Sequence, residues 1–302
     1  MAFLEELRYI AQDGIELGLI WSLLALGVFI SFRVLDFADL TAEGTVTLGS
    51  ALALSLIESN VPPLFATIIA LLGGFAAGIF TGVLHTKLKI PAILAGIISM
   101  TGLYTINIWV LGKAFIYTEK DTLYSFLRKF LADPFLAKSL TALVVVVLFF
   151  FALYWFFGTE IGMSIRATGM NRKMARAQGI NTDVMIILGL AIANALTAAC
   201  GALSAQSMRG ANMDIGRGTI VIGLASIIIG EVIFGKRSFK NWLISVILGS
   251  VIYQILVAVA IRLGMDPNDL KLLQALLITL ILSLPLVKKA VLSRRKEVNG
   301  HA

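Results

Sequence analysis

Residues 24–53 read LALGVFISFRVLDFADLTAEGTVTLGSALA, an apolar run that stops at acidic and polar residues and then resumes. Without gaps and at one constant offset, this stretch aligns with residues 198–227, AACGALSAQSMRGANMDIGRGTIVIGLASI. The identities pair Gly27 with Gly201, Gly44 with Gly218, Thr45 with Thr219, Gly49 with Gly223 and Ala51 with Ala225. We interpret the two stretches as copies of one internal repeat.

The composition around these stretches is that of a membrane protein. Of 302 residues, 58% are hydrophobic and 14% charged, and the mean hydropathy is +0.92. An ordinary soluble domain is about 25% charged, and a helix of about 20 apolar residues crosses the hydrocarbon of a bilayer. The fold class is therefore predicted to be an all-α polytopic membrane protein, which moves a solute rather than transforming one.

Nine apolar runs are candidate transmembrane helices: 15–33, 44–58, 63–84, 91–112, 139–158, 184–204, 218–235, 241–261 and 270–287. The second and seventh are short, so each must thin the bilayer or belong to a discontinuous helix shielded by protein. A first repeat over 15–112 and a second over 184–287 would flank a connecting span, 139–158, that inverts the second copy. Inverted repeats recur in transporters, with the solute path at the repeat interface.

The net charge is +7, and the 25 Lys and Arg lie almost entirely in short loops between the apolar runs and in the tail. This distribution indicates that the cations orient the protein in the membrane rather than bind nucleic acid. The positive-inside trend places loop 159–183 and the basic tail 288–302 in the cytoplasm and the N-terminus outside. The first residues, MAFLEELRYIAQDG, lack the basic region of a signal peptide, so we expect the first span to be retained.

The outer stretch 113–138 carries apolar residues at helical spacing, namely Leu123, Phe126, Leu127, Phe130 and Leu131. Arg128 and Lys129 fall on another face. This pattern predicts an amphipathic helix on the outer surface. It would serve either as a docking platform for an extracellular partner or as an interfacial anchor.

Each copy of the repeat carries polar residues where its apolar run is interrupted: Asp36, Asp39, Thr41 and Glu43 in the first, and Arg209, Asn212, Asp214 and Arg217 in the second. Breaks at membrane depth survive only inside protein or beside a water-filled cavity. The alternative is an ordinary capped turn with solvated charges. Elsewhere Gly74, Gly78 and Gly82, and the small residues of 189–207, predict close helix packing.

The candidate motifs for catalysis, ATP binding and metal binding are incomplete. GEVIFGKR, residues 230–237, has Arg237 where a P-loop needs Ser or Thr, so ATP must be handled by another chain. His85 and His301 are the only histidines, which excludes a histidine metal cluster. The carboxylate pairs Asp36 with Asp39 and Asp266 with Asp269 lie beside turns, so a membrane protease is a weak alternative. We expect no catalytic residue, metal or cofactor in this chain.

Loop 159–183, TEIGMSIRATGMNRKMARAQGINTD, carries the pattern T-x-x-G-x-x-x-R-A…N…A…GI, and its basic residues predict a short amphipathic helix. The pattern comprises Thr159, Gly162, Arg166, Ala167, Asn171, Ala175, Ala177, Gly179 and Ile180. With this loop and its first spans, the sequence resembles the inner-membrane permeases of bacterial ABC importers of the branched-chain amino acid and ribose type. The competing interpretation of the loop is a basic surface helix on anionic lipid.

The resemblance implies partners and a place in the cell. It implies a homodimer of permeases in the bacterial cytoplasmic membrane, two cytoplasmic ATPase subunits that bind ATP and Mg²⁺, and an extracytoplasmic solute-binding protein. Loop 159–183 would couple ATPase closure to the helices by alternating access. The coupling residues would be Arg166, Ala167, Asn171, Arg172, Lys173, Arg176 and Gly179.

The acidic segment DFADLTAEG departs from the branched-chain pattern and is closer to a subgroup associated with tryptophan- or tyrosine-type binding proteins. The cargo is thus expected to be a small solute such as an aromatic or branched-chain amino acid. Asn107, Asn194 and Gln254 are polar residues deep in apolar runs, and they either line the pathway or bond neighbouring helices. The alternative function is an ion-coupled secondary transporter using Glu231, unless that carboxylate only pairs with Lys236 or Arg237.

Overall fold

A computed structural model describes residues 2–128, 134–262, 272, 275, 276 and 279. The long helices are α1 (Ala2–Phe29), α2 (Thr41–Glu58), α3 (Pro63–Thr86), α4 (Ala92–Leu111), α6 (Pro134–Phe156), α9 (Thr182–Met208), α10 (Thr219–Phe234) and α11 (Phe239–Arg262). Three shorter helices are α5 (Leu123–Arg128), α7 (Glu160–Met170) and α8 (Arg172–Ala177). α1 continues into a π-helical segment, η1 (Ile30–Val34), and two strands are β1 (Phe115–Tyr117) and β2 (Gly210–Asn212).

This helix set confirms the all-α polytopic membrane class. In the described part of the chain, 6 helices are long and apolar enough to cross a membrane, namely α1, α3, α4, α6, α9 and α11. α10 is apolar but has only 16 residues, and α2 carries Glu43 and Glu58 within its 18 residues. The predicted ninth span, 270–287, and the tail 288–302 lie outside the described residues apart from a few positions. The inverted repeat stays a prediction.

Helix α9 lies at the centre of the bundle because its small residues admit three neighbours. A Cβ atom added to Gly201 would overlap the carbonyl oxygen of Val46 in α2, and one on Gly78 of α3 would overlap the carbonyl oxygen of Leu190. α1 also packs along α9, with Gly27 against Ala193. The close packing predicted from these small residues is confirmed.

We expect Gly201→Ala to destabilise the protein by about 1–3 kcal/mol, because the new methyl group must push α9 away from the α2 backbone. Thermal unfolding in detergent measures the loss. Gly102→Ala in α4 is the matched control, since nothing lies within 4 Å of its Cβ position and alanine favours a helix. Equal unfolding temperatures for the two variants would contradict the packing argument.

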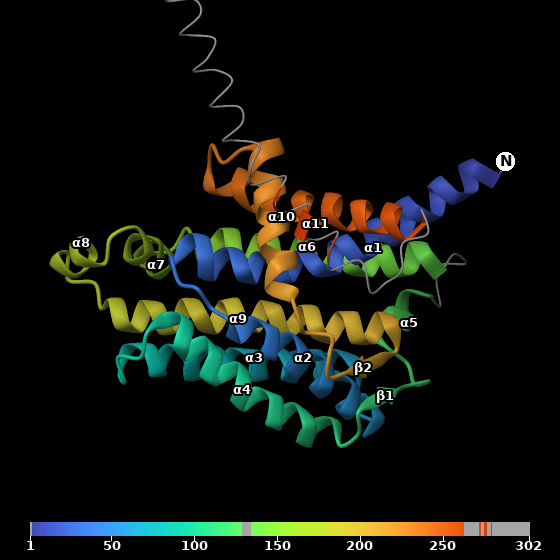
Figure 1. Ribbon diagram of the computed structural model, residues 1–302, viewed down its shortest axis with the longest axis horizontal. Coiled ribbons are helices and arrows are strands. Elements are labelled where there is room, and N and C mark those ends of the chain that lie inside the picture. Colours follow the sequence, from blue (N-terminus) through green and yellow to red (C-terminus); the bar gives the residue numbers. More distant parts are fainter. Residues whose placement is uncertain (1, 129–133, 263–271, 273–274, 277–278, 280–302) are drawn as a thin grey trace, which may run out of the picture.

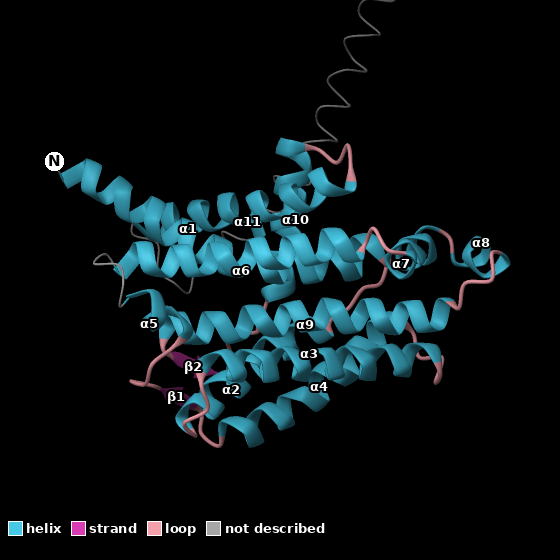
Figure 2. Ribbon diagram, turned by 180° about the vertical axis from the view of Figure 1, so that it is seen from behind, coloured by secondary structure: helices cyan, strands magenta, loops and turns pink. Residues whose placement is uncertain are grey.

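The connecting segments gather at two ends of the bundle (Figure 1). One end carries α7, α8 and the link from α10 to α11, and the other carries α5, β1 and β2 (Figure 2). The strands pair antiparallel, with Ile116 opposite Ala211, and neither strand was predicted from the sequence. The predicted outer helix is helical over Leu123–Arg128, where Tyr124 is buried and Leu123 is half-buried. Phe130 and Leu131 lie outside the described residues.

Candidate solute pocket and coupling segment

The first polar segment, between η1 and α2, is largely enclosed by the helix bundle. Asp36, exposed, has a left-handed backbone with φ 53°, which aspartate tolerates better than most residues. Asp39 is buried, and its Oδ1 accepts the Thr41 backbone N–H at 2.9 Å, which satisfies one of the free N–H groups at the start of α2. Gly44, in the first turn of α2, packs against Met100 and Leu103 halfway along α4. Helix α2 therefore begins inside the bundle rather than at its end.

A buried hydrogen-bond network ties this break to α9. Asp39 Oδ2 accepts from Asn194 Nδ2 at 2.6 Å, and Asn194 Oδ1 accepts from the Thr45 hydroxyl at 3.0 Å. The hydroxyls of Thr45 and Thr197 lie 2.6 Å apart. A buried carboxylate is tolerated only when it is hydrogen-bonded in this way. Asn194 thus bonds neighbouring helices, one of the two roles predicted for it.

The second polar segment returns from β2 to the start of α10. Asn212 and the side chain of Asp214 are exposed, unlike Asp39. Gly218 has φ 79°, and its N–H donates to Glu43 Oε1 at 3.0 Å. The first turns of α2 and α10 therefore meet, and Figure 1 shows α10 running across the direction of the longer helices. Gly44 and Gly218, paired in the sequence alignment, lie on the two sides of this meeting point.

A pocket of about 270 Å³ lies at this junction. Its lining comes from α2, α4 and the segment before α10: Glu43, Gly44, Thr47, Met100, Thr101, Tyr104, Asn107, Met213, Gly216 and Arg217. The volume is near the lower end of the range for ligand pockets, roughly 300–1,000 Å³. The space therefore suits a small solute.

Asn107, in the lining of the pocket, has one side-chain atom without a hydrogen-bond partner among the described residues. Its side chain is 1% exposed, and Nδ2 donates to the Gly44 carbonyl oxygen at 3.1 Å. That carbonyl only accepts, so the amide orientation is fixed. Asn107 Oδ1 is buried with no partner among the described residues. Leaving a buried acceptor unsatisfied costs about 1–3 kcal/mol.

The other predicted pathway residue, Gln254, is buried in α11 and is not among the residues that line this pocket. Tyr104 and Met100 line it without any signal in the sequence, since an aromatic or methionine in an apolar span is usual. Arg217 lies at the pocket with its guanidinium 2.9 Å from Asp214. Arg217 is among the polar residues that the sequence predicted at the second interruption.

The predicted coupling loop forms two helices with defined caps. The Thr159 hydroxyl accepts the Gly162 N–H at the start of α7, and Asn171 Oδ1 accepts two N–H groups at the start of α8. Gly179, with φ 80°, follows α8. α7 lies against η1, because a Cβ on Gly169 would overlap the Val34 carbonyl oxygen. The position of α7 is thus coupled to the segment that leads to Asp39.

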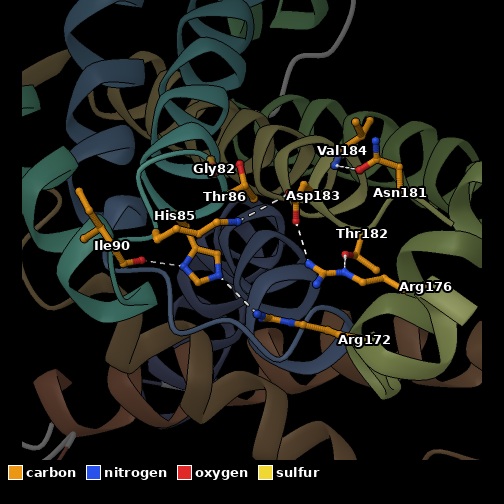
Figure 3. A network of polar contacts seen from close by, with 11 residues as sticks. Gly82, His85, Thr86, Ile90, Arg172, Arg176, Asn181, Thr182, Asp183 and Val184 are labelled. Carbon is orange, nitrogen blue, oxygen red and sulfur yellow. Dashed lines mark hydrogen bonds and ion pairs between the residues drawn. The ribbon is translucent and has the colours of Figure 1, made fainter.

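Two arginines of α8 contact residues at the ends of α3 and α9 (Figure 3). Arg172 Nη1 lies 3.3 Å from His85 Nε2, which accepts because His85 Nδ1 donates to the Ile90 carbonyl oxygen at 2.8 Å. Arg176 donates to the Thr182 hydroxyl at 2.7 Å and forms an ion pair with Asp183 at 3.1 Å. These contacts connect α8 to two long helices at once.

The remaining coupling residues point elsewhere. Lys173 and Met174 are exposed on α8, and Met170 is 89% exposed at the end of α7. Ala167 is half-buried, and the Arg166 guanidinium lies 4.5 Å from the centre of the Phe239 ring. The exposed surface of the loop therefore includes Met170, Lys173 and Met174, and sequence spacing alone did not identify the two methionines.

Comparison with known proteins assigns the chain to a family. Residues 10–283 match the family described as "Branched-chain amino acid transport system / permease component". The chain belongs to this permease family. The resemblance stated from loop 159–183 is thereby confirmed, and so is the prediction of a membrane transport permease.

Three relatives of the permease have different names. It is 39% identical to a tyrosine transport system permease protein of Clostridioides difficile (strain R20291), over 88% of each chain. It is 30% identical to an uncharacterized protein of Rickettsia prowazekii (strain Madrid E), over 91% of this chain and 97% of the relative. An autoinducer 2 import system permease protein of Escherichia coli (strain K12 / DH10B) is 29% identical over 55% of this chain and 48% of its own. No solved structure matches the permease.

Glu231 of the permease has a different partner from the predicted one. Its Oε2 lies 2.8 Å from Arg33 Nη2 in η1, and its Oε1 accepts from Trp242 Nε1 at 2.9 Å. Lys236 instead lies 5.9 Å from the Trp242 ring centre. The pairing with Lys236 or Arg237 expected from sequence was wrong, because the helix directs Glu231 toward α1 rather than along its own axis.

Proposed function

We propose that the permease is the membrane subunit of an ABC-type importer and that its cargo is an aromatic amino acid such as tyrosine. It would act as a homodimer with two cytoplasmic ATPase subunits, which bind ATP and Mg²⁺, and an extracytoplasmic solute-binding protein. The observation that carries the cargo assignment is the pocket at the start of α2 and α10. Membership of the permease family and the name of the clostridial relative support it.

The pocket offers complementary groups to each part of a zwitterionic amino acid. Arg217 and the first turns of α2 and α10 present positive charge to a carboxylate. Asn107 and Glu43 bring an amide and a carboxylate to the pocket lining, which suits an ammonium group. Tyr104 and Met100 present an aromatic ring and a soft apolar surface to the side chain.

The alternating-access step would use the two interrupted segments as inverted-repeat counterparts. The first joins the α7 end of the bundle to α2, and the second joins the β2 end to α10. Because Glu43 contacts Gly218, a shift of either segment changes the pocket. In this proposal α7 and α8 lie in the cytoplasm, the N-terminus lies outside and the tail lies inside.

Uptake by the permease, reconstituted with its ATPase and binding protein, tests the pocket. We expect Asn107→Leu to reduce labelled tyrosine uptake by about 10- to 100-fold, because a hydrogen bond to a charged group contributes about 1.5–3 kcal/mol. Thr105→Val is the control, since Thr105 is exposed on the same helix and is not among the pocket residues. Unchanged uptake in a folded Asn107→Leu protein would refute the assignment.

The ion-coupled alternative makes the opposite prediction at Glu231. Since Glu231 is paired with Arg33, we expect Glu231→Gln to lower the unfolding temperature while ATP-dependent uptake persists. The measurement is uptake with and without ATP across an imposed proton or sodium gradient. Uptake that needs the gradient, ignores ATP and is abolished in Glu231→Gln would establish the secondary transporter instead.

A further inference from the structure

A second cavity, of about 630 Å³, lies at the α7 end of the bundle between the end of α6 and the start of α11. It is lined by Tyr154, Trp155, Phe157, Gly158, Thr159, Arg166, Ser238, Phe239 and Lys240. None of these residues is acidic, and two are cationic. We propose that this cavity binds the headgroup of an anionic phospholipid in the leaflet at the α7 end.

The two cations are placed to bind a phosphate. Arg166 is fixed by stacking over Phe239, whose ring centre lies 5.1 Å from that of buried Phe157. Stacking uses the face of a guanidinium and leaves its N–H edge for an anion. Among the described residues, no carboxylate forms an ion pair with Arg166 or Lys240. Their charge is therefore unneutralised within that part of the chain.

Polar groups complete the headgroup side of the cavity. The Ser238 hydroxyl accepts the Asn241 N–H at the start of α11, so its own hydrogen is free to donate to a ligand. Lys240 follows in the first turn of that helix, where the dipole also favours an anion. Glu160, the acidic residue next to Thr159, is exposed and is not among the lining residues.

The aromatic side of the cavity selects a lipid over a soluble phosphate. Trp155 is 74% exposed and Tyr154 is 46% exposed at the end of the apolar helix α6, as in the aromatic belt of a membrane interface. Leu148 and Phe151, exposed on the same helix, continue the surface into the hydrocarbon region. Acyl chains can lie there while the phosphate reaches Arg166 and Lys240. The cavity thus has the chemistry of a whole lipid.

Native mass spectrometry of the full-length permease, titrated with phosphatidylglycerol or phosphatidylcholine, tests the site. We expect Arg166→Gln/Lys240→Gln to lower the preference for phosphatidylglycerol by roughly 10- to 30-fold, since each cation near an anionic lipid contributes about a fivefold factor. Lys87→Gln/Arg237→Gln is the control, because it removes equal charge from exposed positions at the same end. It should leave the preference unchanged.

Three results would overturn the proposal. Equal losses in both double variants would indicate a diffuse surface charge rather than a site. Binding of inorganic phosphate to lipid-free protein that depends on Arg166 would assign the cavity to a soluble anion. An unchanged preference in the single variant Lys240→Gln would also refute it, because this exposed side chain can be replaced without disturbing the fold. Transport is not measured, so the outcome is independent of the proposed cargo.

Discussion

Asp39→Ala is expected to be the most damaging single substitution at the centre of the bundle. It removes the acceptor for Asn194 and for the Thr41 N–H, both of which are buried. Each group left without a partner costs about 1–3 kcal/mol, so we expect a loss of stability of about 2–5 kcal/mol. Thermal unfolding in detergent and tyrosine uptake measure the effect, and both should fall sharply.

Two further variants test whether the hydrogen-bond network, rather than the charge of Asp39 alone, stabilises the bundle. Asp39→Asn leaves two amide donors facing each other, whereas Asp39→Asn/Asn194→Asp restores a donor opposite an acceptor and keeps an acceptor for Thr45. The double variant should recover only part of the lost stability, because Asn194 Nδ2 also donates to the Leu190 carbonyl oxygen at 3.0 Å and a carboxylate at this position cannot. Asp36→Asn is the control, because the position is exposed and asparagine also tolerates its left-handed backbone. If the double variant is less stable than Asp39→Asn, the network does not hold α2 to α9 as described.

Arg176→Glu is expected to uncouple ATP hydrolysis by the ATPase subunits from solute transport by the permease. The substitution places two carboxylates beside each other, since Arg176 now pairs with Asp183 at the start of α9. Repulsion of on the order of 1–3 kcal/mol would separate α8 from α9 and reduce uptake at least roughly tenfold. ATP hydrolysis and copurification of the ATPase should persist, because the Arg176 guanidinium is engaged with Thr182 and Asp183 of this chain (Figure 3).

Lys173→Glu/Met174→Asp provides the contrast. Both side chains are exposed on α8, so this variant should lose the copurifying ATPase itself. Arg176→Lys keeps the charge and should retain part of the uptake. Loss of the ATPase in Arg176→Glu, or its retention in Lys173→Glu/Met174→Asp, would mean that these residues do not divide the two roles.

The sequence predicted the helices well because the bilayer constrains them. A spanning segment must satisfy its own backbone hydrogen bonds, so each apolar run of sufficient length becomes a helix whatever its neighbours are. Runs 63–84, 91–112 and 184–204 end within four residues of the ends of α3, α4 and α9. Tandem glycines identified the α3 face that packs on α9 for the same local reason, since only small residues allow two backbones to approach so closely.

The candidate site was only partly predictable. Asn107, Asn194 and Gln254 look alike in sequence, as single polar residues in apolar runs. One lines the pocket, one bonds to Asp39, and one lies in α11 away from both. Their roles depend on which helix each faces, and helix periodicity alone cannot specify a neighbour.

By itself, then, the sequence determined the membrane class, the helices, the interruptions at Asp39 and Asp214, and the permease family, because these depend on local hydrophobicity, spacing and motif. Only the tertiary structure decided that Glu231 pairs with Arg33, that Glu43 contacts Gly218, and that β1 pairs with β2. Each joins residues distant in the chain through the packing of α1, α2, α9 and α10. Such contacts depend on how the helices are arranged in three dimensions. Each helix is stable in the membrane without them, so its sequence alone does not specify them.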